Sequence, residues 1–425
     1  MDNDVTIIVG AGAVLDFDHR GIIPTVNNIT EEVLELPVQK VDGGERQLIK
    51  ELYDFMAGRL KLVGNPEVRR YLHPKITFEE LLHVIEMCLS YSSCWHDEYL
   101  HWESFPLFGT LTEPKPFLKS IDTIEYKRAA NILEKKVMEI VNQYDSSFKN
   151  NAATESWYRR FWSSLRGRNI FTLNYDSTIE ESLVSYEDGF EKHGDEKYYR
   201  FSARKYFRNA DTKTTIAHLH GSILYSEPKS FPYEFSIRDL VKNDDYESAC
   251  RNRMVAQSVL RTQANEGYVQ PYVISGSRKT EKMSCAPYNV YLSDLTRKVL
   301  ENKRMIIIGY SFGDQYLNEI LGLGITAHGD EFKVLIIDKF PPYVEGYTSF
   351  LRHLCDKCHF GEYSFISRVV KDRLHVEPGQ KDFPLLVEDC NTPVFSKNGN
   401  LMMCLGGFKD AVEKHSEAIR KYLDF

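Results

Sequence analysis

The sequence predicts an α/β fold in which a parallel sheet has helices on both faces and carries a large helical insertion. Short runs of strand length recur along the chain, and those at 304–308 and 333–337 are apolar almost throughout, as in strands covered on both sides. Segments with helical spacing separate several of these runs, and such alternation is typical of parallel sheets. Between the runs at 5–9 and 169–171 the spacing is mostly helical, which indicates the insertion.

Composition restricts the class of protein. A chain of 425 residues suggests two domains, or one domain with an insertion. The hydrophobic fraction of 42% and the charged fraction of 27% are those of an ordinary globular protein. A net charge of -8 argues against non-specific nucleic-acid binding as the main role. No apolar run reaches bilayer length and no signal-like segment begins the chain, so we expect a cytoplasmic protein without a membrane partner.

Glycines follow the first predicted strand directly. Val5–Val9 is succeeded by Gly10, Ala11 and Gly12. A strand followed by glycines is typical of dinucleotide sites, where glycine lets the backbone approach a pyrophosphate. The third glycine of the usual fingerprint is missing from its expected place, so a simple strand-end turn stays open. A loop containing Pro24 follows where a dinucleotide fold would continue its first helix.

The domain limits follow from these patterns. We expect a Rossmann-like core of residues 1–44 and 167–340, and a helical insertion over 45–166 in which Thr77 caps a helix. Residues 341–425 are predicted to be a C-terminal extension with oligomer or partner contacts, ending in one amphipathic helix over 408–422. Residues 224–267 are polar and are predicted to be mostly helix or loop.

Two groups of cysteine and histidine were considered as metal sites. Cys94, His96 and His101 lie close together, but they lack the spacing and the fourth partner typical of a metal site. The Cys355-x-x-Cys358-His359 segment has no second cysteine pair at a suitable distance. We therefore expect no metal site.

The stretch from Phe171 to Asp176 is the first candidate for chemistry. It reads as a short buried strand that ends at Asn174, and open α/β sheets bind ligands at the carboxyl ends of their strands. The Asn174 amide can both donate and accept hydrogen bonds without carrying charge. The structural alternative is that Asn174 only ends the strand and Asp176 only caps a helix over 177–183.

A histidine and a glycine end the predicted strand at 215–219. Gly221 permits a sharp turn and a close approach of ligand to backbone, and His220 can exchange protons near neutral pH. The alternative is a histidine bonded only to backbone, on the same strand face as His218.

Three later strands end in small or polar residues as well. The strand at 271–274 is followed by Ser275, Gly276 and Ser277, and the strand at 304–308 by Gly309, Tyr310 and Ser311, with Asp314 as cap of the next helix. Asp338 ends the strand at 333–337, where an acid can bind ribose hydroxyls or can simply end the strand. Because the ends of parallel strands converge on one crevice, we interpret these residues together as one site.

As a set, these motifs resemble the sirtuin family in its divergent bacterial branch. The resemblance implies that NAD+ is the substrate, that Asn174 and His220 lie beside the nicotinamide ribose, and that Asp176 orients the site. His220 would act as base, and Asn174 would orient water or the ribose. The matching segments are Gly10–Gly12 with 21–24, Thr172–Asp176, Leu219–Ser222, Gly309–Ser311 and Asp338. The implied NAD+-binding residues are Gly10, Ala11, Gly12, Pro24, Gly221, Gly276, Ser277, Gly309, Ser311 and Asp338.

Two departures refine the expectation. Protein-deacylating sirtuins hold a four-cysteine zinc module after the histidine motif, whereas this region offers only Cys250 and Cys285. Because it lacks this module and carries a helical insertion, the chain resembles the sirtuin-like NAD+ hydrolases of bacterial anti-phage defence, most of all the subunit that pairs with a HerA-type ATPase. The resemblance also implies a homo-oligomer. A protein deacylase and a nucleotide-sensing scaffold without turnover stay open, whereas no paired carboxylates suggest a nuclease.

Overall fold

The computed structural model of the chain describes residues 5–17, 22–62, 76–93, 116–151, 156–165, 168–226, 240–253, 272, 274, 282–339, 392–396 and 399–424. Within these ranges, no helix is both long and apolar enough to cross a bilayer.

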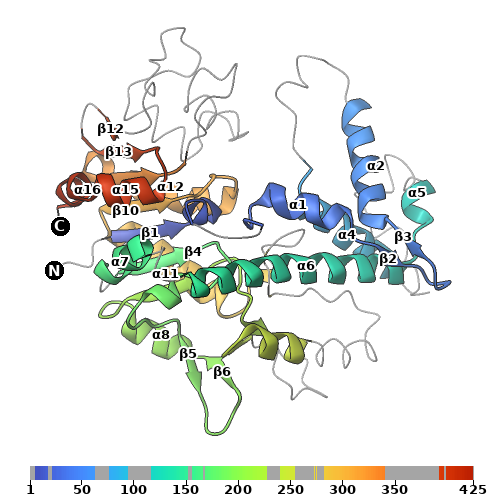
Figure 1. Cartoon of the computed structure of the whole chain (residues 1–425). Coiled ribbons are helices and arrows are strands. Elements are labelled where there is room, and N and C mark those ends of the chain that lie inside the picture. The colour runs from blue at the N-terminus through green and yellow to red at the C-terminus, as the bar shows by residue number, and fades with distance from the viewer. Residues whose placement is uncertain are drawn as a thin grey trace.

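The largest sheet, called the main sheet, lies in the left-hand part of Figure 1 and has seven strands in the order β12-β13-β11-β10-β1-β4-β7. Six strands are parallel, and only β12 runs antiparallel to its neighbour. Numbered along the chain, the six parallel strands have the order 3-2-1-4-5-6 of a Rossmann-like sheet. The predicted fold class is therefore confirmed. The strands are β1 (Val5–Val9), β4 (Asn169–Thr172), β7 (Thr215–His218), β10 (Arg304–Ile308), β11 (Lys333–Ile337), β12 (Val394–Phe395) and β13 (Leu401–Cys404).

Helices cover both faces of the main sheet. On one face Ile8 and Ile307 pack with α11 (Tyr288–Glu301) and α12 (Gln315–His328). On the other, Ile7 and Ile306 pack with three helices that present Trp157, Phe408 and Tyr422. Burial on both sides explains why the central strands are continuously apolar. The three helices are α7 (Ser156–Ser164), α15 (Phe408–Lys414) and α16 (Ser416–Leu423).

A helical module with its own apolar core lies to one side of the main sheet (Figure 1). Its longest helix, α6, runs from the module to the sheet and begins at the cap Asp122, whose carboxylate accepts from the Ile124 N–H at 2.7 Å. Thr77 caps α4 as predicted, since the Glu80 N–H donates to its hydroxyl. The elements are α1 (Val26–Leu34), β2 (Val38–Gln39), β3 (Glu45–Arg46), α2 (Leu48–Leu62), α4 (Phe78–Ser93), α5 (Pro116–Lys119) and α6 (Thr123–Asn150).

The observed packing crosses the domain limits expected from the sequence. Helix α1, assigned to the core, contributes Ile29 and Val33 to the module, and α7, assigned to the insertion, covers the main sheet. Strand β13 lies in the expected extension and yet pairs with β11. The short run Leu401–Cys404 is a strand because β11 offers it an edge, and this pairing is not visible in the local pattern.

One local prediction is incomplete and another is wrong. Residues 224–267 are mostly helix or loop where the structure describes them, as predicted, but they also include β8 (Tyr225–Ser226) and β9 (Val241–Asn243). These two strands join β5 (Phe190–Lys192) and β6 (Tyr198–Phe201) in a second, antiparallel sheet beside α8 (Ala203–Asn209). Strands this short depend on their partners, so local propensity does not reveal them. The final amphipathic segment is two helices, because the backbone leaves helical geometry at His415, with φ -120° and ψ 9°.

Candidate active site

The ends of five neighbouring parallel strands bring the candidate residues to one edge of the main sheet. In spatial order the edge carries Asp338, Gly309, Gly10, Asn174 and His220, which follow β11, β10, β1, β4 and β7. Asn174 and His220 lie at equivalent register on neighbouring strands, because each is two residues beyond a paired position of β4 and β7. Four strand spacings of about 4.8 Å put Asp338 roughly 19 Å from the His220 end of the edge.

Two glycine loops interlock where the strand order reverses, between β1 and β10. The Gly12 N–H donates to the Gly309 carbonyl at 2.8 Å, and Gly309 has a left-handed φ of +60°. A Cβ on Gly309 would lie 2.1 Å from the Ala13 nitrogen, and one on Gly10 would lie 2.6 Å from the Gly309 oxygen. These glycines are therefore required by the close approach of two backbones, which accounts for them without any bound ligand.

Asn174 has a fixed backbone and an unbonded side chain. Its N–H donates to the Thr172 hydroxyl at 3.0 Å, and its carbonyl lies 3.0 Å from Nδ1 of His218. The side chain is buried, and its amide forms no hydrogen bond with any residue that the structure describes. Among the described residues, the amide therefore keeps its hydrogen-bonding capacity for a ligand, beyond the strand-ending role that the sequence left open.

Asn174 is held by a buried chain of charged groups. His218 donates to Asn174 through Nδ1 and meets Glu180 Oε1 through Nε2 at 2.7 Å, so both ring nitrogens carry protons. Burial opposes this charge, but the Glu180 carboxylate raises the pKa of His218 above its ordinary value. Burial likewise opposes ionisation of Glu180, but His218 lowers the pKa of Glu180 to about 2. Beyond them Lys242 pairs with Asp188 at 2.6 Å and lies 4.0 Å from Glu180.

Asp176 lies in the turn that follows Asn174. Its carboxylate accepts from the Thr178 N–H at 3.1 Å and from the Thr178 hydroxyl. Burial, assisted by the charge of Asp145, raises the pKa of Asp176 to about 6. Asp145, on α6, accepts from the Ser177 N–H at 2.9 Å. The predicted helix over 177–183 is wrong: the segment is a turn with a short 3-10 helix, η3 (Glu180–Ser182), because these side-chain bonds satisfy its backbone locally.

His220 meets a carboxylate from a distant loop. Its Nε2 lies 3.1 Å from Oδ2 of Asp314, whose other oxygen accepts from the Leu317 N–H at 3.1 Å. Asp314 therefore caps α12 as predicted, and it also contacts His220, which the sequence reasoning missed. Gly221 adopts φ +103°, and a Cβ there would lie 1.9 Å from the carbonyl oxygen of Tyr272. The tight turn expected after His220 is present.

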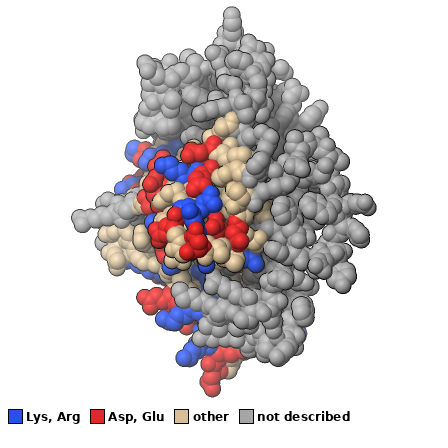
Figure 2. Space-filling view, turned by 90° about the vertical axis from the view of Figure 1, so that its right-hand side faces the viewer, with Lys and Arg blue, Asp and Glu red and all other residues tan. Residues whose placement is uncertain are grey.

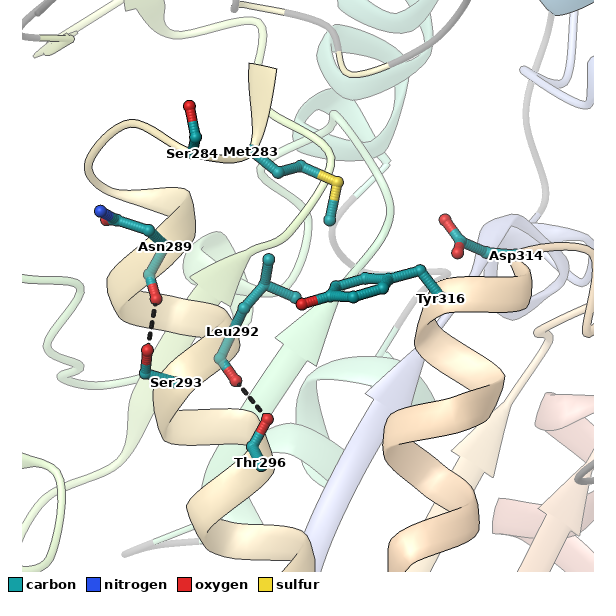
Figure 3. Close-up of a pocket in the computed structure, with 8 residues that line it drawn as sticks. All are labelled: Met283, Ser284, Asn289, Leu292, Ser293, Thr296, Asp314 and Tyr316. Carbon is teal, nitrogen blue, oxygen red and sulfur yellow. Dashed lines mark hydrogen bonds between the residues drawn. The ribbon is translucent and has the colours of Figure 1, made fainter. Parts of the chain in front are cut away.

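A cavity of about 360 Å³ lies between the N-terminal ends of α11 and α12, and Asp314 forms part of its wall (Figure 3). Figure 3 shows the ring of Tyr316 reaching across toward Leu292 and Met283. The hydroxyls of Ser293 and Thr296 donate to backbone carbonyls of α11, so they are already bonded. The remaining lining residues are Ser284 and Asn289.

The other predicted binding residues lie apart from the Asn174–His220 end. Ser311 is exposed beside Gly309, and Asp338 is half-buried, with its carboxylate accepting from the Lys339 N–H at 2.8 Å. Ala11 begins the 3-10 helix η1 (Ala11–Val14) after the first glycine loop. Pro24 precedes Thr25, the cap of α1. Gly276 and Ser277 lie outside the described residues.

Among the described residues, no group of three or more histidine, cysteine, aspartate or glutamate side chains could hold a metal ion. The segments around Cys94, His96 and His101, and around Cys355, Cys358 and His359, lie outside the described ranges.

One family model matches part of the chain. No curated protein matches the chain closely enough to serve as a relative. Residues 168–347, which contain β4, β7, β10 and β11 and therefore both Asn174 and His220, match the profile of the SIR2-like domain. SIR2-like domains are NAD-dependent. The match therefore supports a SIR2-like domain over this part of the chain, and domains of that kind use NAD+.

Proposed function

We propose that this protein is an NAD+ hydrolase that converts NAD+ and water to nicotinamide and ADP-ribose. One observation carries the proposal: within the SIR2-like segment, the unbonded Asn174 amide and the His220 imidazole follow neighbouring strands at equivalent register. The substrate is a dinucleotide, and the ligand edge of the sheet suits its length, because Asp338 lies roughly 19 Å from the His220 end by strand spacing.

In the proposed reaction, the bond between the nicotinamide nitrogen and ribose C1 breaks, and the hydroxyl of a water molecule adds to C1. The Asn174 amide holds that water or a ribose hydroxyl, and its neutrality suits a ribose that develops positive charge. His220 accepts the proton that the water loses and releases it to solvent, so nicotinamide, ADP-ribose and one proton are formed. Asp176 supports the turn that carries Asn174.

The binding surface in this proposal comes from the remaining strand ends. Ser311 and Asp338 offer a hydroxyl and a carboxylate to the half of NAD+ remote from nicotinamide. The interlocked glycines let the two central loops lie close together, so the ligand edge stays unobstructed by side chains at Gly10, Gly12 and Gly309. Ala11, Pro24, Gly221, Gly276 and Ser277 complete the proposed set.

We further propose a defence role, in which NAD+ depletion stops an infected bacterial cell. The resemblance to anti-phage sirtuin-like proteins supports this role, together with cytoplasmic location, homo-oligomerisation and control by a HerA-type ATPase. The helical module is a suitable place for control, because α6 joins it to the site: Asp145 bonds Ser177, and Tyr175 packs against the module core. In the described part of the face seen in Figure 2, basic and acidic side chains are intermixed, a pattern that does not favour nucleic acid as the partner there.

The test is nicotinamide release from NAD+ by purified protein, alone and with the ATPase, followed by chromatography. Asn174→Ala should reduce release by at least about 100-fold if the amide orients the water. Asn27→Ala, on the exposed side of α1, is the matched control and should retain wild-type release. Equal release by wild type and Asn174→Ala would refute the site, and deacetylation of an acetyl-lysine peptide that requires NAD+ would instead favour a deacylase.

A further inference from the structure

The carboxylate of Asp314 is the side-chain partner of His220. The two residues are 94 positions apart, yet His220 Nε2 lies 3.1 Å from Asp314 Oδ2. Both side chains are largely buried, with 11% and 12% of their surface exposed. A helix cap needs only one carboxylate oxygen, and Asp314 uses Oδ1 for the Leu317 N–H, so Oδ2 is directed at the histidine.

The turn before α12 holds Asp314 in place by a specific set of bonds. Phe312 adopts a left-handed backbone with φ +57°, which is uncommon for a bulky residue. Asn318 donates to the Phe312 carbonyl at 2.8 Å and accepts from the Tyr310 hydroxyl at 3.0 Å. The same hydroxyl lies 3.1 Å from the Asp314 carbonyl and 3.2 Å from its nitrogen. Strained backbone that is held in place by surrounding bonds is a feature of functional sites. Here it directs the Asp314 carboxylate at His220.

The contact determines which nitrogen of His220 is basic. A carboxylate only accepts hydrogen bonds, so the proton of the neutral ring is held on Nε2. The lone pair then lies on Nδ1, which forms no hydrogen bond with any residue in the described part of the chain. A neutral imidazole oriented in this way can take a proton only through Nδ1.

We propose that Asp314 is a positioning residue for His220: it fixes the ring orientation and the tautomer that make Nδ1 the proton acceptor. This inference rests on the proposed function, in which His220 receives the proton of the attacking water.

Asp314→Asn separates positioning from capping, because asparagine is as good a helix cap as aspartate. Its amide cannot be relied on to accept from Nε2, and it lacks the charge that stabilises a protonated ring. We expect kcat for nicotinamide release to fall by about 100- to 10,000-fold, with KM for NAD+ changed less than about threefold. Asp122→Asn, at the cap of α6, is the matched control and should keep wild-type kcat and KM. An Asp314→Asn enzyme with kcat within about threefold of wild type would overturn the proposal.

A second measurement uses the protein without NAD+. In ¹⁵N-histidine-labelled protein, the His220 signals are assigned by their loss in His220→Gln, and wild type should show the ring proton on Nε2. Asp314→Asn should shift the population toward the Nδ1-protonated tautomer. Nδ1 protonation in wild type would overturn the inference. If wild type released no nicotinamide under any condition, the proposed function would fail, and the tautomer alone would then decide whether Asp314 positions His220.

Discussion

Glu180→Gln tests the buried charge chain behind Asn174. The substitution keeps the shape of the side chain but leaves the His218 cation buried without its counter-charge. A pKa lowered from the ordinary 4.5 to about 2 corresponds to roughly 3 kcal/mol of stabilisation, at about 1.4 kcal/mol per unit. Breaking a buried ion pair by removing one partner costs about 3–5 kcal/mol, which agrees in size. We expect Glu180→Gln to lower the free energy of unfolding by about 3 kcal/mol near pH 6.

The stabilisation that the His218–Glu180 pair provides depends on pH, and the directions of the two pKa shifts decide where it is lost. The depressed pKa of Glu180 means that its contribution is present above pH 4.5 and is lost as pH falls toward 2. The raised pKa of His218 means that its contribution is complete below pH 6.5 and is lost as pH rises through the folded-state value. The difference between wild type and Glu180→Gln should therefore be largest between about pH 4.5 and 6.5 and should shrink at higher pH.

The assay is urea unfolding at pH 5.5, 7.0 and 8.5, followed by circular dichroism. The matched control is Glu181→Gln, the neighbouring residue, which is 43% exposed and pairs with Lys149 at the surface. It should cost less than about 1 kcal/mol at each pH. A penalty for Glu180→Gln that equals the control, or that does not change with pH, would refute a charged His218–Glu180 pair.

Three further predictions concern the turn, the glycine loops and the module. Asp176→Asn keeps an oxygen that can accept from Thr178, and because burial raises the pKa of Asp176 to about 6, wild type should lose stability relative to this variant as pH rises from about 4 to 6; a tenfold loss of nicotinamide release in this variant would support an orienting role. Gly309→Ala should destabilise by more than about 3 kcal/mol or prevent folding, whereas Gly313→Ala, where the nearest atom is 3.5 Å away, should stay within about 1 kcal/mol by thermal unfolding. Glu86→Gln removes the negative charge that lies 2.7 Å from the fully buried Lys282 and should cost about 3–5 kcal/mol by urea unfolding, and a cost below 1 kcal/mol would contradict a buried ion pair.

The helical module and the candidate site share one rigid element. Met138 and Val141 of α6 pack on Ile223, three residues beyond His220, while the earlier turns of the helix form the module core. Arg253 donates to the carbonyls of Tyr225 and Ile223, each at 2.7 Å, and so holds the same loop. A partner that moved the module would therefore act on the loop that follows His220, which is the physical basis for the control proposed above.

Local sequence patterns were enough to predict the two central strands of the main sheet, β1 and β10. Val5–Val9 and Arg304–Ile308 were predicted with the observed bounds, because a strand buried on both faces must be apolar throughout and ends where that run ends. The convergence of Gly10, Asn174 and His220 on one edge followed from parallel strands alone. The roles of these residues in chemistry remain predictions.

The sequence did not predict the polar contacts of the two histidines. The sequence placed Glu180 within the predicted helix over 177–183 and Asp314 at the cap of the next helix, and it predicted no histidine contact for either, because a charged residue is usually solvated and its burial depends on a partner. Their partners, His218 and His220, lie 38 and 94 residues away along the chain. The only hint in the sequence was an acid within a few residues of a candidate strand end.

By itself, the sequence determined the parallel sheet and the edge at which its strand ends bring the Asn174 amide and the His220 imidazole together, since apolar runs and strand-end turns are local properties. Only the tertiary structure decided which carboxylate faces each histidine, which short segments become strands β8, β9 and β13, and that α6 connects the module to the site. The reason is physical: a buried charge or an edge strand is stable only beside its partner, and chain spacing does not specify that neighbour.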